Sequence, residues 1–110
     1  MNVLELTEKT GWGCIAAKGH LDKEIKGAYC GDLLSWVMGN GEPDQAWITV
    51  QVHMNVIAVA VLREFSCIVI ADGANVPEEV IERAEEEGIP LLESNLPVYD
   101  TAKKLVELGI

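Results

Sequence analysis

Three apolar runs in the second half of the chain show no alternation of polar and apolar positions. They cover residues 46–50, 67–71 and 89–93, and the first two are rich in β-branched or aromatic side chains. Such composition over so short a length is typical of β-strands. Strands that stay apolar at consecutive positions are covered on both faces, as in parallel α/β sheets. The pattern therefore predicts an α/β fold with a largely parallel central sheet.

A helix is predicted between the second and third of these strands, because apolar residues recur there at helical spacing. Asn75 is placed to cap it, Glu78 to complete a capping box, and Gly88 to end it. Its other positions are mostly glutamates, which we expect to face solvent. A last helix is predicted over residues 97–108, with four residues in the core. These are Val98, Ala102, Leu105 and Val106.

The segment at residues 53–62 fits two structures. Its many β-branched residues favour a strand by local propensity. If the runs at 46 and 67 are neighbouring parallel strands, however, the residues between them must cross over, which normally requires a helix. We therefore predict a helix here, apolar nearly all round and hence buried.

The N-terminal part of the chain is less regular. Strands are predicted near residues 2–6, 14–17 and 25–29, followed by a short helix over 32–38. Residues 39–44 have the glycine, proline and aspartate content of a loop. No repeat or linker divides the sequence, so we predict a single domain over residues 1–110.

The charge balance narrows the classes of function. The 110 residues include 18 Asp and Glu against 8 Lys and Arg, a formal net charge of −10. This disfavours binding to a nucleic-acid polymer or to an anionic membrane, since both attract basic surfaces. It does not exclude one small phosphorylated ligand, which backbone amides can hold. The N-terminus lacks a signal peptide's basic flank, and polar residues interrupt the apolar stretch 46–62, so we expect a soluble cytoplasmic protein.

Cysteine and histidine usage gives no indication of a metal site. Cys14, Cys30 and Cys67 are widely spaced and form no Cys-x-x-Cys pair. We therefore expect buried reduced thiols rather than a disulfide framework or structural zinc. His20 lies in a polar segment, where we expect it to be solvated, and no His or Cys cluster accompanies His53. No metal and no cofactor is expected.

Polar residues follow each of the three predicted strands. The first strand runs into Thr49, Gln51, His53 and Asn55, the second into Asp72 and Gly73, and the third into Ser94 and Asn95. The carboxyl ends of parallel strands meet at one edge of a sheet, and ligands of α/β proteins bind at that edge. These residues are therefore the candidate ligand site.

A structural role is the alternative for the same residues. The four polar residues after the first strand could instead satisfy the ends of a strand and a helix, with His53 or Asn55 as a cap. Asp72-Gly73 is weakly similar to a phosphate-binding turn, and a plain turn into the next helix is the better explanation. No phosphate-loop or nucleophile-elbow motif and no acid/base pair occurs, so no catalytic residue is predicted.

The three tryptophans divide between two roles. We expect one or two of Trp12, Trp36 and Trp47 in the core. Trp36 has apolar neighbours on its predicted helix, so it is either buried or part of an oligomer contact.

The blocks at residues 27–39, 47–60 and 89–109 resemble those of the DRTGG domain family in its stand-alone form. The resemblance implies a three-layer α/β/α sandwich similar to the N-terminal domain of HPr kinase/phosphorylase, and it supports a helix after His53. Related copies in phosphotransacetylases and CBS-domain pyrophosphatases are regulatory or dimer-forming modules without catalysis of their own. The family's Asp-Arg-Thr-Gly-Gly motif is not present, and Ala71-Asp72-Gly73 is at most its remnant.

The leading hypothesis is a non-enzymatic regulatory or assembly module, a homodimer that binds a small nucleotide or phosphorylated metabolite. One alternative is a small enzyme or enzyme subunit whose site is completed across a dimer by His53 and Asp72. Another is a pure interaction module that docks on a larger metabolic or redox enzyme. Six of the acids lie on the helix over 78–87, so the negative charge indicates a solubilising face rather than a cationic ligand.

Overall fold

The computed structural model describes residues 1–110, which contain one five-stranded sheet with the strand order β1-β5-β4-β3-β2. The strands are β1 (Gly13–Ala16), β2 (Gly27–Cys30), β3 (Gln45–Thr49), β4 (Cys67–Ile70) and β5 (Leu91–Glu93). The helices are α1 (Val3–Thr10), α2 (Leu34–Asn40), α3 (Met54–Arg63), α4 (Glu78–Glu87) and α5 (Val98–Glu107), with a short 3-10 turn at Lys18–His20.

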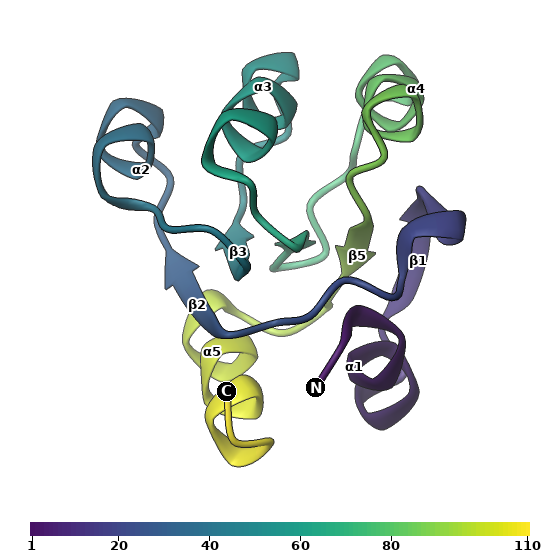
Figure 1. Cartoon of the computed structure of the whole chain (residues 1–110), viewed down its shortest axis with the longest axis vertical. Coiled ribbons are helices and arrows are strands. Elements are labelled where there is room, and N and C mark those ends of the chain that lie inside the picture. The colour runs from purple at the N-terminus through teal and green to yellow at the C-terminus, as the bar shows by residue number, and fades with distance from the viewer.

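Helices cover both faces of the sheet. Helices α2, α3 and α4 lie on one face, and α1 and α5 lie on the other (Figure 1). Each face has its own apolar cluster, with Trp47, Ile57 and Phe65 in the first and Leu6 and Ile48 in the second. The predicted three-layer α/β/α architecture is confirmed.

The sheet is parallel over most of its width. Strands β2, β3, β4 and β5 are parallel neighbours, and only β1 runs antiparallel, beside β5. Every residue of β4 is buried, as are residues 46–49 of β3, because helices cover both faces. This explains why these strands are apolar at consecutive positions rather than at alternate ones.

The helix predicted over residues 53–62 is confirmed as α3. The expectation that it is buried on all sides is wrong. The side facing the sheet is buried, and it consists of Val56, Ile57, Val59 and Ala60. The opposite side is exposed, and it consists of Met54, Ala58, Val61 and Leu62. A helix in the outer layer of a single chain has only one side that its own sheet can cover.

Helices α4 and α5 are confirmed, with two corrections. Pro77 rather than Asn75 occupies the N-cap of α4, and no side chain caps that end, because the helix begins only at Glu78. Gly88 ends α4 in the left-handed conformation, as predicted. In α5, Val106 is 70% exposed, because Leu105 takes the inward position and the next residue is turned about 100° away from it.

The strand predicted near residues 2–6 is wrong, because this segment begins helix α1. Asn2 and Glu5 form a capping box: Asn2 Oδ1 accepts the Glu5 N–H at 2.9 Å, and Glu5 Oε1 accepts the Asn2 N–H at 3.2 Å. Val3 and Leu6, one helical turn apart, are the buried residues of this helix. The other two N-terminal strands and helix α2 lie where the sequence predicted them, within two residues at each end.

Two further expectations concern single residues and membranes. Trp12 and Trp47 are buried and Trp36 is exposed, which confirms that one or two tryptophans belong to the core. None of the helices combines the length and the hydropathy that a membrane span requires.

Candidate functional site

The carboxyl ends of β2, β3, β4 and β5 lie at one edge of the sheet, here called the carboxyl edge, because these strands are parallel. At this edge the chain leaves neighbouring strands β4 and β5 in opposite directions. Helix α4 follows β4 on one face of the sheet, and α5 follows β5 on the other (Figure 1). Divergence of this kind produces the crevice in which open α/β sheets bind ligands.

The two loops at this divergence contain four of the predicted site residues and contact each other. The Asp72 N–H donates to the Leu96 carbonyl at 2.8 Å, and the Gly73 N–H donates to the Ser94 carbonyl at 3.1 Å. Asn95 Oδ1 lies 3.3 Å from the position that a Cβ on Gly73 would occupy. The structure therefore brings Asp72, Gly73, Ser94 and Asn95 together. In this state the two amides of the turn bind the neighbouring loop rather than solvent.

Asp72 and Gly73 have consecutive left-handed conformations, with φ values of 60° and 62°. The Ala74 N–H closes the turn by donating to the Ala71 carbonyl at 3.1 Å. Aspartate tolerates this conformation better than most residues, and glycine adopts it freely. The geometry is that of a tight turn between β4 and the approach to α4.

Thr49 and Ser94 have structural roles, because both side chains are fully buried. Thr49 Oγ1 donates to Asp32 Oδ1 at 2.7 Å and accepts the Gln51 N–H at 3.1 Å. Ser94 Oγ shares a hydrogen bond of 2.9 Å with Thr101 Oγ1 and accepts the Leu96 N–H. These hydroxyl groups hold the loops in place and are not turned toward a ligand.

Asp32 is a residue of this edge that the sequence did not single out. Its Oδ1 accepts both the Thr49 hydroxyl and the Val50 N–H, the latter at 2.9 Å. The carboxylate therefore fixes the loop that follows β3 from the end of the neighbouring strand β2. The sequence signal that could have indicated it was its place between the predicted strand over 25–29 and the rest of the predicted helix over 32–38, next to Gly31.

His53 caps helix α3, as one of the two predicted caps. Its Nδ1 accepts the Asn55 N–H at 3.1 Å, so in the neutral ring the proton is on Nε2, which has no partner in the chain. The side chains of Gln51, Asn55 and Asn95 are exposed and form no hydrogen bond within the chain. Three free amides and one imidazole N–H are thus available at the carboxyl edge.

Comparison of the sequence with models of known families identifies the family of this chain. A model of the DRTGG domain matches residues 38–108. The chain belongs to the DRTGG domain family. Helix α1 and strands β1 and β2 of this DRTGG domain precede the matched region.

The fold of this DRTGG domain is similar to that of a larger solved structure. That structure contains the CBS and DRTGG domains of the regulatory region of Clostridium perfringens pyrophosphatase, complexed with its activator diadenosine tetraphosphate. The TM-score is 0.73 and the sequence identity is 12%, and the match covers 94% of this chain and 45% of that chain. The DRTGG domain described here thus spans less than half the length of that regulatory region. No curated protein matches the chain.

A hollow of about 410 Å³ in this DRTGG domain lies at the opposite, amino-terminal edge of the sheet. Its walls combine apolar residues such as Phe65 and Ile89 with acidic ones such as Glu24 and Glu64. Lys23 Nζ donates to the Gly88 carbonyl at 2.8 Å beside it, and burial lowers the pKa of this amine. The hollow is assembled from four segments that are far apart in the sequence, so no local sequence pattern indicated it.

The three thiols differ in burial. Cys67 is buried in β4 as expected, and this burial raises its pKa to about 12. Cys14 is half-buried in β1, and Cys30 is exposed in β2, which corrects the expectation of a buried thiol there. Partial burial raises the pKa of both, and the nearby Asp32 charge raises that of Cys30 further. Raised pKa values leave little thiolate at neutral pH, which makes these thiols poor nucleophiles.

Proposed function

We propose that this DRTGG domain is a non-enzymatic regulatory module that binds a small nucleotide or phosphorylated metabolite at the carboxyl edge. The observation that carries the proposal is the divergence of α4 and α5 above the loops that contain Asp72, Gly73 and Asn95. Family membership supports a regulatory role, and the fold supports the position of the site.

The free polar groups at this edge have the chemistry that a nucleotide requires. Amide side chains such as those of Gln51, Asn55 and Asn95 can donate to and accept from the same base edge. Helix α3 begins at the same edge with no acidic side chain in its first turn, so its Met54 N–H, which has no acceptor within the chain, can contribute to holding a phosphate. A site of this composition explains how a chain of charge −10 can bind an anion.

The solved relative supports the class of ligand. The regulatory region of the pyrophosphatase is described in complex with a dinucleotide activator, but it also contains CBS domains that this chain does not cover. The position of the activator there is therefore not assigned to this chain. The proposal for this chain rests on its own carboxyl edge.

Isothermal titration calorimetry with AMP, ADP, ATP, diadenosine tetraphosphate and acetyl phosphate tests this proposal. We expect heat of binding with at least one of these compounds, and a loss of affinity of about tenfold in Asn95→Ala. Asn40→Ala is the matched control, because Asn40 is an exposed asparagine at the far end of α2. Flat titrations with every compound, or equal affinities of the two variants, would contradict ligand binding at this edge.

We also propose that the module acts as a homodimer. The exposed apolar residues of α2 and α5 support self-association, because large apolar side chains at the surface of a soluble domain often belong to an interface. Sedimentation velocity over a range of concentrations measures this directly, and a monomer at all concentrations would remove this part of the proposal.

A further inference from the structure

Strand β2 ends the sheet, and one of its edges has no partner strand. The Gly31 N–H donates to the Ile48 carbonyl of β3 at 3.2 Å, so the backbone groups of Gly31 point toward β3. Alternate residues of a strand turn their N–H and C=O groups to opposite edges. Tyr29 therefore also pairs with β3, whereas Ala28 and Cys30 turn their backbone groups outward.

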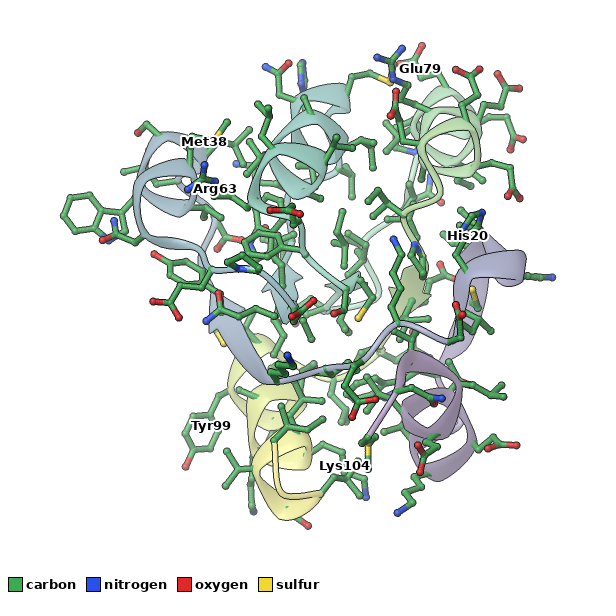
Figure 2. All side chains as sticks on the ribbon, in the orientation of Figure 1. His20, Met38, Arg63, Glu79, Tyr99 and Lys104 are labelled. Atoms are coloured by element: carbon green, nitrogen blue, oxygen red, sulfur yellow. The ribbon has the colours of Figure 1, made fainter.

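Exposed apolar side chains flank this edge on both faces of the sheet. Helix α2 is the last helix of its layer beside β2, and its Leu33 and Trp36 are 67% and 64% exposed. On the opposite face, Tyr99 of α5 is 77% exposed and points to the side on which β2 lies (Figure 2). Val106 follows on the same face of α5, two turns further along. The β2 surface is defined here as Ala28, Cys30, Leu33, Trp36, Tyr99 and Val106.

The part of the β2 surface that β2 and α2 contribute is nearly free of charge in a strongly acidic chain, whereas α5 adds the exposed Lys103 between Tyr99 and Val106. Residues 27–41 contain a single charged side chain, Asp32. Asp32 Oδ1 is already bound by Thr49 and Val50, so one carboxylate oxygen remains free. Two chains of charge −10 repel each other least where acidic residues are missing, which favours contact between copies on this side.

The geometry points to a second copy of this chain as the partner of β2, paired antiparallel about a two-fold axis at Tyr29. In this register Ala28 of one copy lies opposite Cys30 of the other, and each such pair exchanges two backbone hydrogen bonds. Lys26 and Asp32 are each three residues from Tyr29, so Lys26 of one copy lies level with Asp32 of the other. Lys26 already forms an exposed ion pair with Asp44 of its own chain, with 3.5 Å between Nζ and Oδ2, so in this register Asp44 and the second copy's Asp32 would share one cation. This inference rests on the proposed homodimer and assigns its interface.

Sedimentation velocity of the full chain tests the interface. Trp36→Glu and Tyr99→Glu place a charge on either flank of β2, and we expect each to raise the dimer dissociation constant by at least about tenfold. Leu62→Glu is the matched control, because Leu62 is 59% exposed on α3, away from β2. This control should leave the dissociation constant within about twofold of the parent value.

Cross-linking identifies the register. In the proposed pairing the two Cys30 residues are diagonal neighbours, roughly 7–8 Å apart, which is too far for a disulfide but within reach of a short bis-maleimide. In a Cys14→Ser background at mildly alkaline pH, we expect a covalent dimer through Cys30. Tyr99→Glu should abolish this product, whereas Leu62→Glu should retain it.

If Trp36→Glu and Tyr99→Glu leave the dimer dissociation constant unchanged and no dimer is cross-linked through Cys30, the interface at β2 is wrong, although the protein is still a homodimer. A monomer at every concentration overturns both. Neither result bears on ligand binding, which the calorimetry with Asn95→Ala measures on its own.

Discussion

The two edge strands of the sheet, β1 and β2, differ in regularity. Strand β1 is irregular: its register against β5 shifts between Cys14 and Ala16, and the next residue, Ala17, is left-handed at φ 59°. Strand β2 keeps an unbroken register with β3 over all its residues, and neither edge strand has a charged side chain. Bulges and charges are the usual means by which proteins prevent edge strands from pairing. The β1 edge has an irregularity of this kind, and the β2 edge does not.

The helices beside the two edges show the same contrast. Helix α1, which lies beneath β1, begins with a complete capping box (Figure 1). Helix α2, beside β2, begins at Leu34, and its N-cap residue Leu33 has a side chain that cannot cap and is exposed to solvent. An exposed leucine at an N-cap leaves the first N–H groups of the helix without a side-chain acceptor, and in the isolated chain its apolar surface gains little from burial. The β1 side thus has both a bulged edge strand and a capped helix, and the β2 side has neither.

The largest expected effect comes from Gly41→Ala, which disturbs the β2 side through the core. A Cβ at this position would lie 2.9 Å from Phe65 Cε1 and 3.0 Å from the Val37 carbonyl. The Phe65 ring cannot easily yield, because it packs against Trp47 with ring centroids 5.5 Å apart. We expect a loss of about 3 kcal/mol in the free energy of unfolding, measured by urea denaturation.

Gly39→Ala is the control for this change. Gly39 lies in the same helix, α2, and a Cβ there meets nothing within 4 Å. Since alanine is the better helix former, we expect this variant to gain about 0.5–1 kcal/mol. Similar stabilities for the two variants would show that α2 can move freely, and that its apolar residues are not held in place beside β2.

The next effect concerns the β1 side. Asn2→Ala removes the side-chain acceptor of the α1 capping box, and we expect it to cost about 1 kcal/mol of unfolding free energy. Glu8→Ala, at an exposed position of the same helix, should change stability by less than about 0.5 kcal/mol. Equal losses in the two variants would mean that the cap does not stabilise this side of the sheet.

The contrast between the edges also shows what the sequence could predict. The strands β3, β4 and β5 followed from consecutive apolar positions, and α3 followed from the need for a crossover despite its β-branched residues. Helix α1 was not predicted, although Asn2 and Glu5 have the spacing of a capping box. The segment has only a few apolar positions, and their spacing is compatible with a strand as well as with a helix. Local patterns identify elements, but the end of a short element depends on its caps.

The candidate site was predictable only in part. The meeting of Asp72, Gly73 and Asn95 followed from parallel strands that end at one edge. The inward orientation of Thr49 and Ser94 did not, because it depends on partners contributed by other parts of the fold, such as Asp32. Local patterns likewise could not predict which side chains beside the edge strands β1 and β2 are exposed.

The smallest expected effect is that of Leu33→Ser, which distinguishes a change in the stability of the monomer from a change in the affinity of the dimer. Leu33→Ser supplies an N-cap acceptor for α2 and removes an exposed apolar side chain, so we expect the monomer to gain about 0.5–1 kcal/mol while the dimer weakens. Leu33→Ala is the matched control, which removes the side chain without adding a cap. It should weaken the dimer equally without the gain in stability. If Leu33→Ser instead destabilises the monomer, Leu33 packs against its own chain, and its side chain no longer supports a partner at the β2 surface.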